Sequence, residues 1–219
     1  INDKPVSGTE ILSLVNKNNF KKLPLGFIKK KSIKNEYLQD ISSKINLKKP
    51  IKIVVDSGNG AAGCIASDLF KSIGCEVVDI FSEIDGNFPN HHPDPSKLEN
   101  LIDLKNKIRS EQADLGVAFD GDGDRVGLVT EKEEVVFPDK ILMILAIDIL
   151  KKNKDKKIIF DVKCSKDLES IIRNHGGIPI MSPTGHFHIK NNIKKHDAVL
   201  AGEMSGHIFI SDSWYGFDD

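Results

Sequence analysis

Three aspartates at alternate positions form an acidic loop at residues 120–124, where the sequence reads Asp-Gly-Asp-Gly-Asp. The glycines accept backbone dihedrals that other residues avoid, so the three carboxylates can fold around one point. Crowded anionic groups repel one another unless a cation neutralises them, and ligation by oxygen alone selects a hard ion, Mg²⁺ or Ca²⁺, over zinc. The spacing therefore predicts that Asp120, Asp122 and Asp124 bind a divalent metal.

Two other interpretations of this loop are weaker. An aspartate-glycine turn in a hairpin needs no metal, but three aspartates within five positions exceed what a turn requires. A helix-flanked calcium loop would have the aspartates at its positions 1, 3 and 5 and Glu131 at position 12. Such a loop requires glycine where this chain has Arg125, and strands rather than helices are expected on both sides. A calcium-sensing loop is therefore not favoured.

Arg125 follows the acidic loop in a chain that otherwise uses lysine for nearly all of its positive charge. The other arginines are Arg109 and Arg173. A planar guanidinium suits bidentate recognition of phosphate or anchoring of the carboxylates, and balancing of local charge is the simpler alternative. A metal beside a phosphate-binding arginine is typical of phosphoryl transfer, in which positioning and electrostatic stabilisation supply most of the catalysis.

A second polar group follows three expected strands in the C-terminal part of the chain. It comprises Lys163, His186, Glu203, Ser205 and His207. If those strands are parallel neighbours, these residues gather at one sheet edge. They offer a cation for phosphate, hydrogen-bonding groups for sugar hydroxyls and imidazoles that move protons near neutral pH. Each alone is weak evidence, because isolated histidines and lysines are usually surface residues. Glu203 is the strongest candidate, since a glutamate in a glycine-rich loop is seldom needed for packing.

Two further polar segments are interpreted as structural. Residues 56–60 resemble a strand-to-helix phosphate turn, but a glycine-rich turn of this kind is not specific. Residues 85–95 form a proline-rich connection that contains His91 and His92. Metal binding by these two histidines is the minor alternative.

The elements expected around these residues alternate between strands and helices from Pro50 onward. Apolar runs predict strands at residues 51–55, 76–81, 115–119, 126–130, 158–162, 178–181 and 198–201. Periodicity predicts helices at 8–16, 61–73, 98–109, 140–151, 166–174 and 189–195, and one that contains Leu38, Ile41 and Ile45. Thr9 and Ser165 are the expected N-caps of two of them. This pattern predicts the α/β class, with two consecutive three-layer α/β/α domains and mixed, largely parallel sheets.

The composition disfavours several other classes of protein. The net charge of -1 and the dispersed lysines predict no nucleic-acid partner, and the lysine-rich residues 29–34 are interpreted as a solvated linker. The three cysteines show no Cys-x-x-Cys spacing, which disfavours disulfides and fits the reducing cytoplasm. No run of 18 apolar residues and no signal peptide occurs, so no membrane partner is expected. Because the sequence does not begin with Met, we expect an internal piece of a longer protein.

Taken together, these segments closely resemble the α-D-phosphohexomutase family, and within it the bacterial phosphomannomutase/phosphoglucomutase group. The matching segments are VVDSGNGAAG (54–63), DGNFPNHHPDP (85–95), AFDGDGDRVG (118–127), FDVKCS (160–165), TGH (184–186), GEMSGH (202–207) and WYGFDD (214–219). They run from about Ile51 to the end of the chain, and jointly they are very specific.

The resemblance implies an enzyme of four domains that interconverts hexose 1-phosphate and hexose 6-phosphate of mannose or glucose. The reaction would pass through a phosphoserine and a bisphosphorylated sugar. Residues 1–35 would be the tail of the first domain and a linker, 36–136 the second domain, and 137–219 a third domain truncated at its C-terminus. Asp120, Asp122 and Asp124 would bind Mg²⁺ together with a phosphoserine oxygen.

The resemblance also implies roles for the other polar residues. Arg125 and Lys163 would contact the substrate, Glu203 and Ser205 would bind sugar hydroxyls, and His186 and His207 would contact the substrate or assist proton transfer. Arg125, His186 and His207 are thus the expected catalytic residues. Met204 favours phosphomannose and phosphoglucose over the phosphoglucosamine branch of the family, which usually has Gln there. Pro183 departs from the Lys that close relatives tend to carry at this position.

The larger departure is the absence of two family segments. The phosphoserine loop, Thr-x-Ser-His-Asn, and the phosphate-binding loop of the fourth domain do not occur in this sequence. We therefore expect the fragment alone to be inactive and the remaining domains of the same polypeptide to be its partners. The alternatives are a phosphoglucosamine mutase, a non-catalytic metal-binding module and a Mg²⁺ phosphatase with an aspartyl nucleophile. The phosphatase would require Thr or Val directly after its Asp-x-Asp, where this chain has Gly123.

Overall fold

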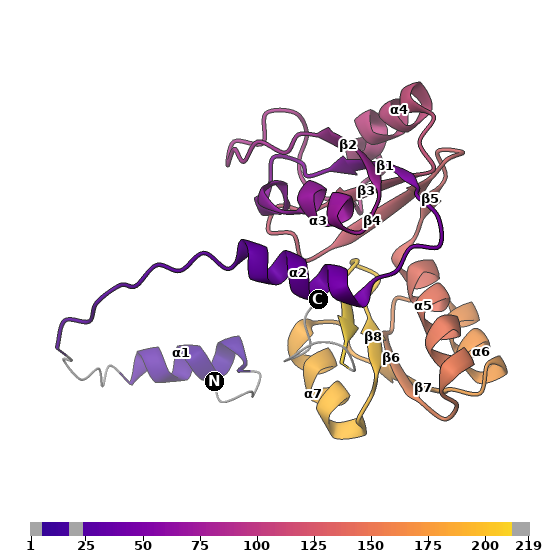
Figure 1. The fold of residues 1–219 in the computed structure, drawn as a ribbon. Coiled ribbons are helices and arrows are strands. Elements are labelled where there is room, and N and C mark those ends of the chain that lie inside the picture. The colour runs from indigo at the N-terminus through magenta and orange to yellow at the C-terminus, as the bar shows by residue number, and fades with distance from the viewer. Residues whose placement is uncertain (1–5, 18–23, 212–219) are drawn as a thin grey trace.

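The computed structural model describes residues 6–17 and 24–211, which form two α/β units and two preceding helices (Figure 1). The preceding helices are α1 (Gly8–Asn16) and α2 (Lys34–Lys44). The first sheet has the strand order β2-β1-β3-β4-β5. Its strands are β1 (Lys52–Asp56), β2 (Glu76–Ile80), β3 (Leu115–Phe119), β4 (Val126–Thr130) and β5 (Val135–Val136). Its helices are η1 (Ala61–Cys64), α3 (Ala66–Ser72), η2 (Leu98–Leu101) and α4 (Ile102–Glu111).

The central strand β1 is buried on both faces because helices cover both sides of the sheet. Val54 packs with Leu104 and Ile108 of α4 on one face. Its neighbours Ile53 and Val55 point to the opposite face, where they pack with the η1–α3 segment. β1 runs parallel to β2 and β3, whereas β4 is antiparallel to both of its neighbours, β3 and β5. The three consecutive apolar residues of β1 therefore reflect burial on two faces.

The second sheet repeats the arrangement of the first. Its order is β7-β6-β8-β9, with β6 parallel to β7 and β8, and β9 antiparallel to β8. The strands are β6 (Lys157–Asp161), β7 (Ile178–Ser182), β8 (Leu200–Gly202) and β9 (Ile208–Ile210), and the helices are α5 (Pro138–Lys152), α6 (Lys166–Asn174) and α7 (His186–His196). α5 and α6 cover one face and α7 covers the other. The hairpin loop β3–β4 thus corresponds to the hairpin loop β8–β9.

The expected class, two α/β units with mixed sheets, is confirmed, but several details differ. Ser7 rather than Thr9 is the N-cap of α1, since its side chain accepts the N–H of Glu10 at 3.2 Å. The helix expected at 61–73 is broken at Ile65 into η1 and α3. A Cβ at Gly63 would lie 2.1 Å from the carbonyl oxygen of Ser82, so a tertiary approach shapes this segment.

Other boundaries shift in ways that affect the candidate site. The helix expected at 189–195 begins three residues earlier, so His186 lies in the first turn of α7. Ser165 is confirmed as the N-cap of α6, since its hydroxyl accepts the N–H of Asp167 at 3.1 Å. Residues 214–219, part of the family resemblance, lie outside the described residues. Across the described ranges, no helix is long and apolar enough to cross a membrane.

The two segments interpreted as structural meet at the end of β1. Asp56 is fully buried, and its carboxylate accepts the N–H of Gly58 at 2.9 Å. His91 Nε2 lies 3.0 Å from Asp56 Oδ2, and its Nδ1 lies 3.0 Å from the carbonyl oxygen of His92. Both ring nitrogens therefore face acceptors, an environment that favours the imidazolium form.

Replacing His91 with glutamine is expected to lower the free energy of unfolding by about 2 kcal/mol at pH 6 and by less at pH 9. The hydrogen bond to Asp56 raises the pKa of His91 although burial opposes the shift. A raised folded-state pKa gives stability that is fully present below the unfolded value of about 6.5 and is lost as pH rises through the folded value. Urea denaturation at the two pH values measures this difference. His92→Gln, at the exposed neighbour, is the control, and equal losses for His91→Gln at both pH values would contradict the interpretation.

Candidate functional site

Asp120 closes the acidic loop between β3 and β4. Its side chain is buried, and Oδ1 accepts the N–H groups of Gly123 at 3.1 Å and Arg125 at 3.0 Å. Oδ2 accepts Nε–H of Arg125 at 2.6 Å. Gly123 has φ +81°, a conformation that L side chains rarely adopt. One carboxylate and one glycine therefore fix the curvature of the loop.

The three aspartates lie close enough to share one ion. One carboxylate oxygen from each of Asp120, Asp122 and Asp124 lies within 4.8 Å of the others. Asp122 is exposed and Asp124 is partly buried, so solvent reaches the group. Burial raises the pKa of Asp124, and the charges of Asp120 and Asp122 raise it further while His207 opposes them. Three hard oxygen donors under mutual repulsion fit Mg²⁺.

Arg125 anchors the acidic loop in this structure. Its Nη1 also lies 3.4 Å from Asp94 Oδ1, and its Nε lies 3.9 Å from Asp124 Oδ1. Burial raises the pKa of Asp120, but the hydrogen bonds and charge of Arg125 outweigh it and hold that pKa below its usual value. Of the two functional interpretations of Arg125, these contacts favour anchoring of the carboxylates. Its contact with substrate stays a prediction.

The turn at residues 56–60 and the residue after it pack against the backbone of the acidic loop. The N–H of Ala61 donates to the carbonyl oxygen of Gly121 at 2.9 Å. A Cβ at Gly60 would lie 2.7 Å from that same oxygen, so only glycine permits this approach. The segment that resembled a phosphate turn thus has a structural contact with the metal-binding candidate.

Glu203 organises the corresponding loop between β8 and β9. Its carboxylate is buried; Oε1 accepts the N–H of Gly185, and Oε2 lies 3.0 Å from His207 Nδ1. Ser205 Oγ lies 2.8 Å from the same nitrogen. Burial raises the pKa of Glu203, but the hydrogen bonds from His207 and Gly185 outweigh it, and the net pKa is lowered. Glu203, Ser205 and His207 therefore form one hydrogen-bonded group.

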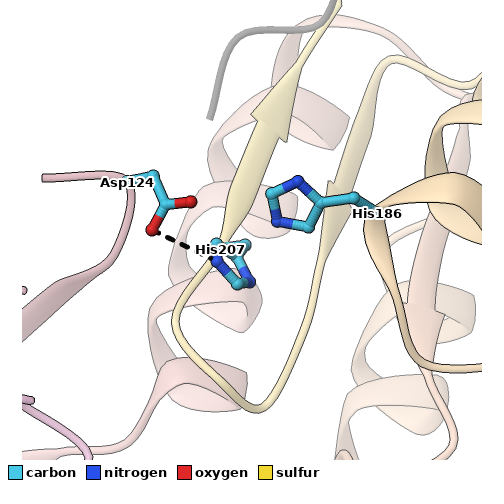
Figure 2. A group of neighbouring side chains, drawn as sticks. All are labelled: Asp124, His186 and His207. Carbon is cyan, nitrogen blue, oxygen red and sulfur yellow. Dashed lines mark ion pairs between the residues drawn. The ribbon is translucent and has the colours of Figure 1, made fainter. Parts of the chain in front are cut away.

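The two hairpin loops meet at His207. Its Nε2 lies 3.3 Å from Asp124 Oδ1 of the acidic loop (Figure 2). The ring of His186 packs edge-on against that of His207, with centroids 4.1 Å apart. Five of the predicted site residues, Asp124, His186, Glu203, Ser205 and His207, are thus brought together from both units. Lys163 lies at the same sheet edge, but its side chain is exposed.

Asp161, at the end of β6, was missed as a site residue by the sequence-based prediction. It is fully buried, and its Oδ1 accepts the N–H of Lys163 at 3.2 Å, the thiol of Cys164 at 3.2 Å and the N–H of Met204 at 3.3 Å. Its Oδ2 accepts the hydroxyl of Thr184 at 2.9 Å. One carboxylate therefore ties together the three loops that carry Lys163, His186 and Glu203. The available signal was an aspartate that directly ends an apolar strand.

Comparisons with known proteins match both units. The family description "Phosphoglucomutase/phosphomannomutase, alpha/beta/alpha domain II" matches residues 35–133, and that of domain III matches residues 137–219. A phosphomannomutase/phosphoglucomutase from Pseudomonas syringae pv. tomato is 56% identical over 194 residues, which cover 89% of this chain and 42% of that protein. A phosphoglucomutase from Neisseria gonorrhoeae is 47% identical over 211 residues, 96% of this chain and 46% of that protein.

A solved structure from the same family also matches this chain. The crystal structure of a phosphoglucomutase/phosphomannomutase family protein from Burkholderia thailandensis matches with a TM-score of 0.92 and 45% identity, over 96% of this chain and 46% of that one. The chain thus spans somewhat less than half the length of these relatives. Because the two domain descriptions follow one another along most of the sequence, the chain belongs to the phosphoglucomutase/phosphomannomutase family and contains its second and third α/β/α domains.

Proposed function

We propose that this chain is the central part of a phosphomannomutase/phosphoglucomutase, an isomerase that interconverts hexose 1-phosphate and hexose 6-phosphate. The observation that carries the proposal is the meeting of the two hairpin loops, with Asp124 3.3 Å from His207. Acidic oxygen ligands and a group suited to sugar hydroxyls then face one shared space. Relatives named phosphomannomutase/phosphoglucomutase support the substrate class, with mannose and glucose phosphates as its members.

In the proposed mechanism, the side chains of this chain position the sugar phosphate and handle its proton. Mg²⁺ held by the three aspartates would supply positive charge for phosphoryl transfer. Arg125 keeps Asp120 ionised and in place. Glu203 and Ser205 would bind sugar hydroxyls. His207, with Nδ1 oriented by Glu203, would take the proton of the attacking hydroxyl, and His186 and Lys163 would contact the substrate.

The phosphoserine belongs, in this proposal, to a first domain of the same polypeptide. It gives its phosphoryl group to the sugar, and the bisphosphorylated sugar turns round and returns the other one. Residues 1–35 would be the tail of that first domain. The half-exposed apolar side chains of α1 support this assignment, since they are suited to packing against a domain; they are Ile11, Leu12, Leu14 and Val15. The cysteines without disulfide spacing support a cytoplasmic location.

The full-length protein that contains this chain provides the test of function. It should convert glucose 1-phosphate or mannose 1-phosphate to the 6-phosphate in a coupled dehydrogenase assay, and EDTA should abolish the conversion. The isolated 219-residue chain should show no turnover. A full-length protein without mutase activity on either sugar would contradict the proposal. Turnover by the isolated chain would contradict the inference that the nucleophilic serine lies outside this chain.

Asp122→Asn is expected to weaken Mg²⁺ binding to the isolated chain by roughly 10- to 100-fold, because one of three anionic ligands becomes neutral. Calorimetric titration with MgCl₂ measures the change. Asp148→Asn, at an exposed position on α5, should leave the affinity unchanged. Equal affinities for the wild-type chain and Asp122→Asn would place the ion elsewhere.

A further inference from the structure

Two histidines and one aspartate form a ligand set that differs in chemistry from the acidic loop. His186 is the first residue of α7, His207 precedes β9, and Asp124 belongs to the β3–β4 hairpin. One ligand atom from each lies within 4.8 Å of the others. Figure 2 shows the ring of His186 pointing toward His207, which in turn faces Asp124. We propose that these three residues form a second metal site, one for Zn²⁺ or a similar transition-metal ion.

The distances suit a four-coordinate ion. Zinc holds nitrogen and oxygen ligands at about 2.0–2.2 Å, which puts neighbouring ligand atoms about 3.4 Å apart in a tetrahedron. His207 Nε2 and Asp124 Oδ1 are already 3.3 Å apart. The ligand atom that His186 offers lies within 4.8 Å of the other two, so a bound ion would draw this ring closer to complete the set. The fourth position is left for water or an anion.

Glu203 supplies the support that ligating histidines usually have. Its Oε2 lies 3.0 Å from Nδ1 of His207, whose other ring nitrogen faces Asp124. A carboxylate behind an imidazole fixes the orientation of the ring and raises the basicity of the nitrogen that binds metal. Glu203 is buried, so this orientation does not depend on a mobile surface group.

The ligand types separate this site from the proposed Mg²⁺ site. Imidazole nitrogen suits zinc and its neighbours, whereas Mg²⁺ demands octahedral oxygen ligation. Asp124 belongs to both sets, and two dications around one carboxylate repel each other. Occupation of the histidine site therefore opposes Mg²⁺ binding and clamps the acidic loop to the β8–β9 loop. The proposal rests on these contacts and does not require the mutase function.

The test uses the purified 219-residue chain with Co²⁺ as a spectroscopic probe that Zn²⁺ displaces. We expect the intense visible absorption of four-coordinate Co²⁺, lost on addition of Zn²⁺. His186→Ala should weaken Co²⁺ binding by about 10-fold or more and leave Mg²⁺ affinity unchanged. Asp122→Asn should weaken Mg²⁺ binding and leave Co²⁺ affinity unchanged. Asp124→Asn should weaken the binding of both ions. His188→Ala is the matched control, an exposed histidine on the same helix.

The outcomes distinguish this site from the acidic loop. The weak absorption of six-coordinate Co²⁺, or Co²⁺ affinity that Asp122→Asn lowers and His186→Ala does not, would overturn the proposal. If His186→Ala fails to fold, His186→Gln, which keeps polarity without the imidazole, replaces it. Tight Co²⁺ binding with no measurable Mg²⁺ binding would support this site while contradicting the proposed Mg²⁺ dependence.

Discussion

Replacing Asp161 with alanine is expected to lower the free energy of unfolding by about 3–5 kcal/mol, because two partly buried backbone N–H groups lose their buried acceptor and each costs about 1–3 kcal/mol. Those groups belong to Lys163 and Met204. Hydrogen exchange followed by NMR measures the effect, and both amides should lose protection before the rest of the second sheet does. The loops that carry the sugar-binding candidates would then separate.

Asp161→Asn tests whether the geometry of these hydrogen bonds is understood. Its amide oxygen can keep the three donors on the Oδ1 side, and its NH₂ group can donate to the hydroxyl of Thr184, which then turns to act as an acceptor. We therefore expect a loss of about 1 kcal/mol for asparagine. Asp148→Ala, at an exposed position, is the control. Equal losses for Asp161→Asn and Asp161→Ala would contradict this account.

Arg125→Ala is expected to lower the free energy of unfolding by about 2–4 kcal/mol at pH 7, because it leaves the buried carboxylate of Asp120 without its cation. The depressed pKa of Asp120 contributes stability above the unfolded value of about 3.9, and this contribution is lost as pH falls. The difference between wild type and variant should therefore be full at pH 7 and shrink below about pH 4. Urea denaturation across this range measures it.

Two other substitutions act as controls for that prediction. Arg125→Lys keeps the charge but loses the fixed fork, so an intermediate loss is expected. Arg173→Ala removes an exposed pair with Glu169 and should cost about 0.5 kcal/mol or less. A deficit for Arg125→Ala that does not change between pH 7 and pH 3 would show that Asp120 is not the group affected.

Much of the fold follows from local patterns. A run of consecutive apolar residues, such as 53–55 in β1, is buried on both faces of its sheet, and such runs predicted the strands. The break at Ile65 was not predictable, because the contact of Gly63 with Ser82 joins segments from different parts of the unit. The prediction of Thr9 as the N-cap of α1 was wrong for a local reason. Ser7 and Thr9 are both capping residues, and periodicity does not separate positions two apart.

The candidate site was predicted where polar residues interrupt apolar strands at their ends. Asp120 and Glu203 stood out because glycines surround them. Asp161 has no flanking glycines. Its role comes from hydrogen bonds with Thr184 and Met204, which are 23 and 43 residues away along the chain. Contacts at that separation depend on strand order, which a single sequence does not specify.

The shared strand order of the two sheets has an evolutionary consequence. Each unit presents one hairpin loop to the same space, and the apolar clusters that stabilise each sheet lie mainly in its strands and helices. Residues 120–125 and 203–207 can therefore diverge without repacking either core. Selection on the proposed metal site and selection on the proposed sugar-binding group would then act mainly on two separate stretches of the gene, which meet in space at Asp124 and His207.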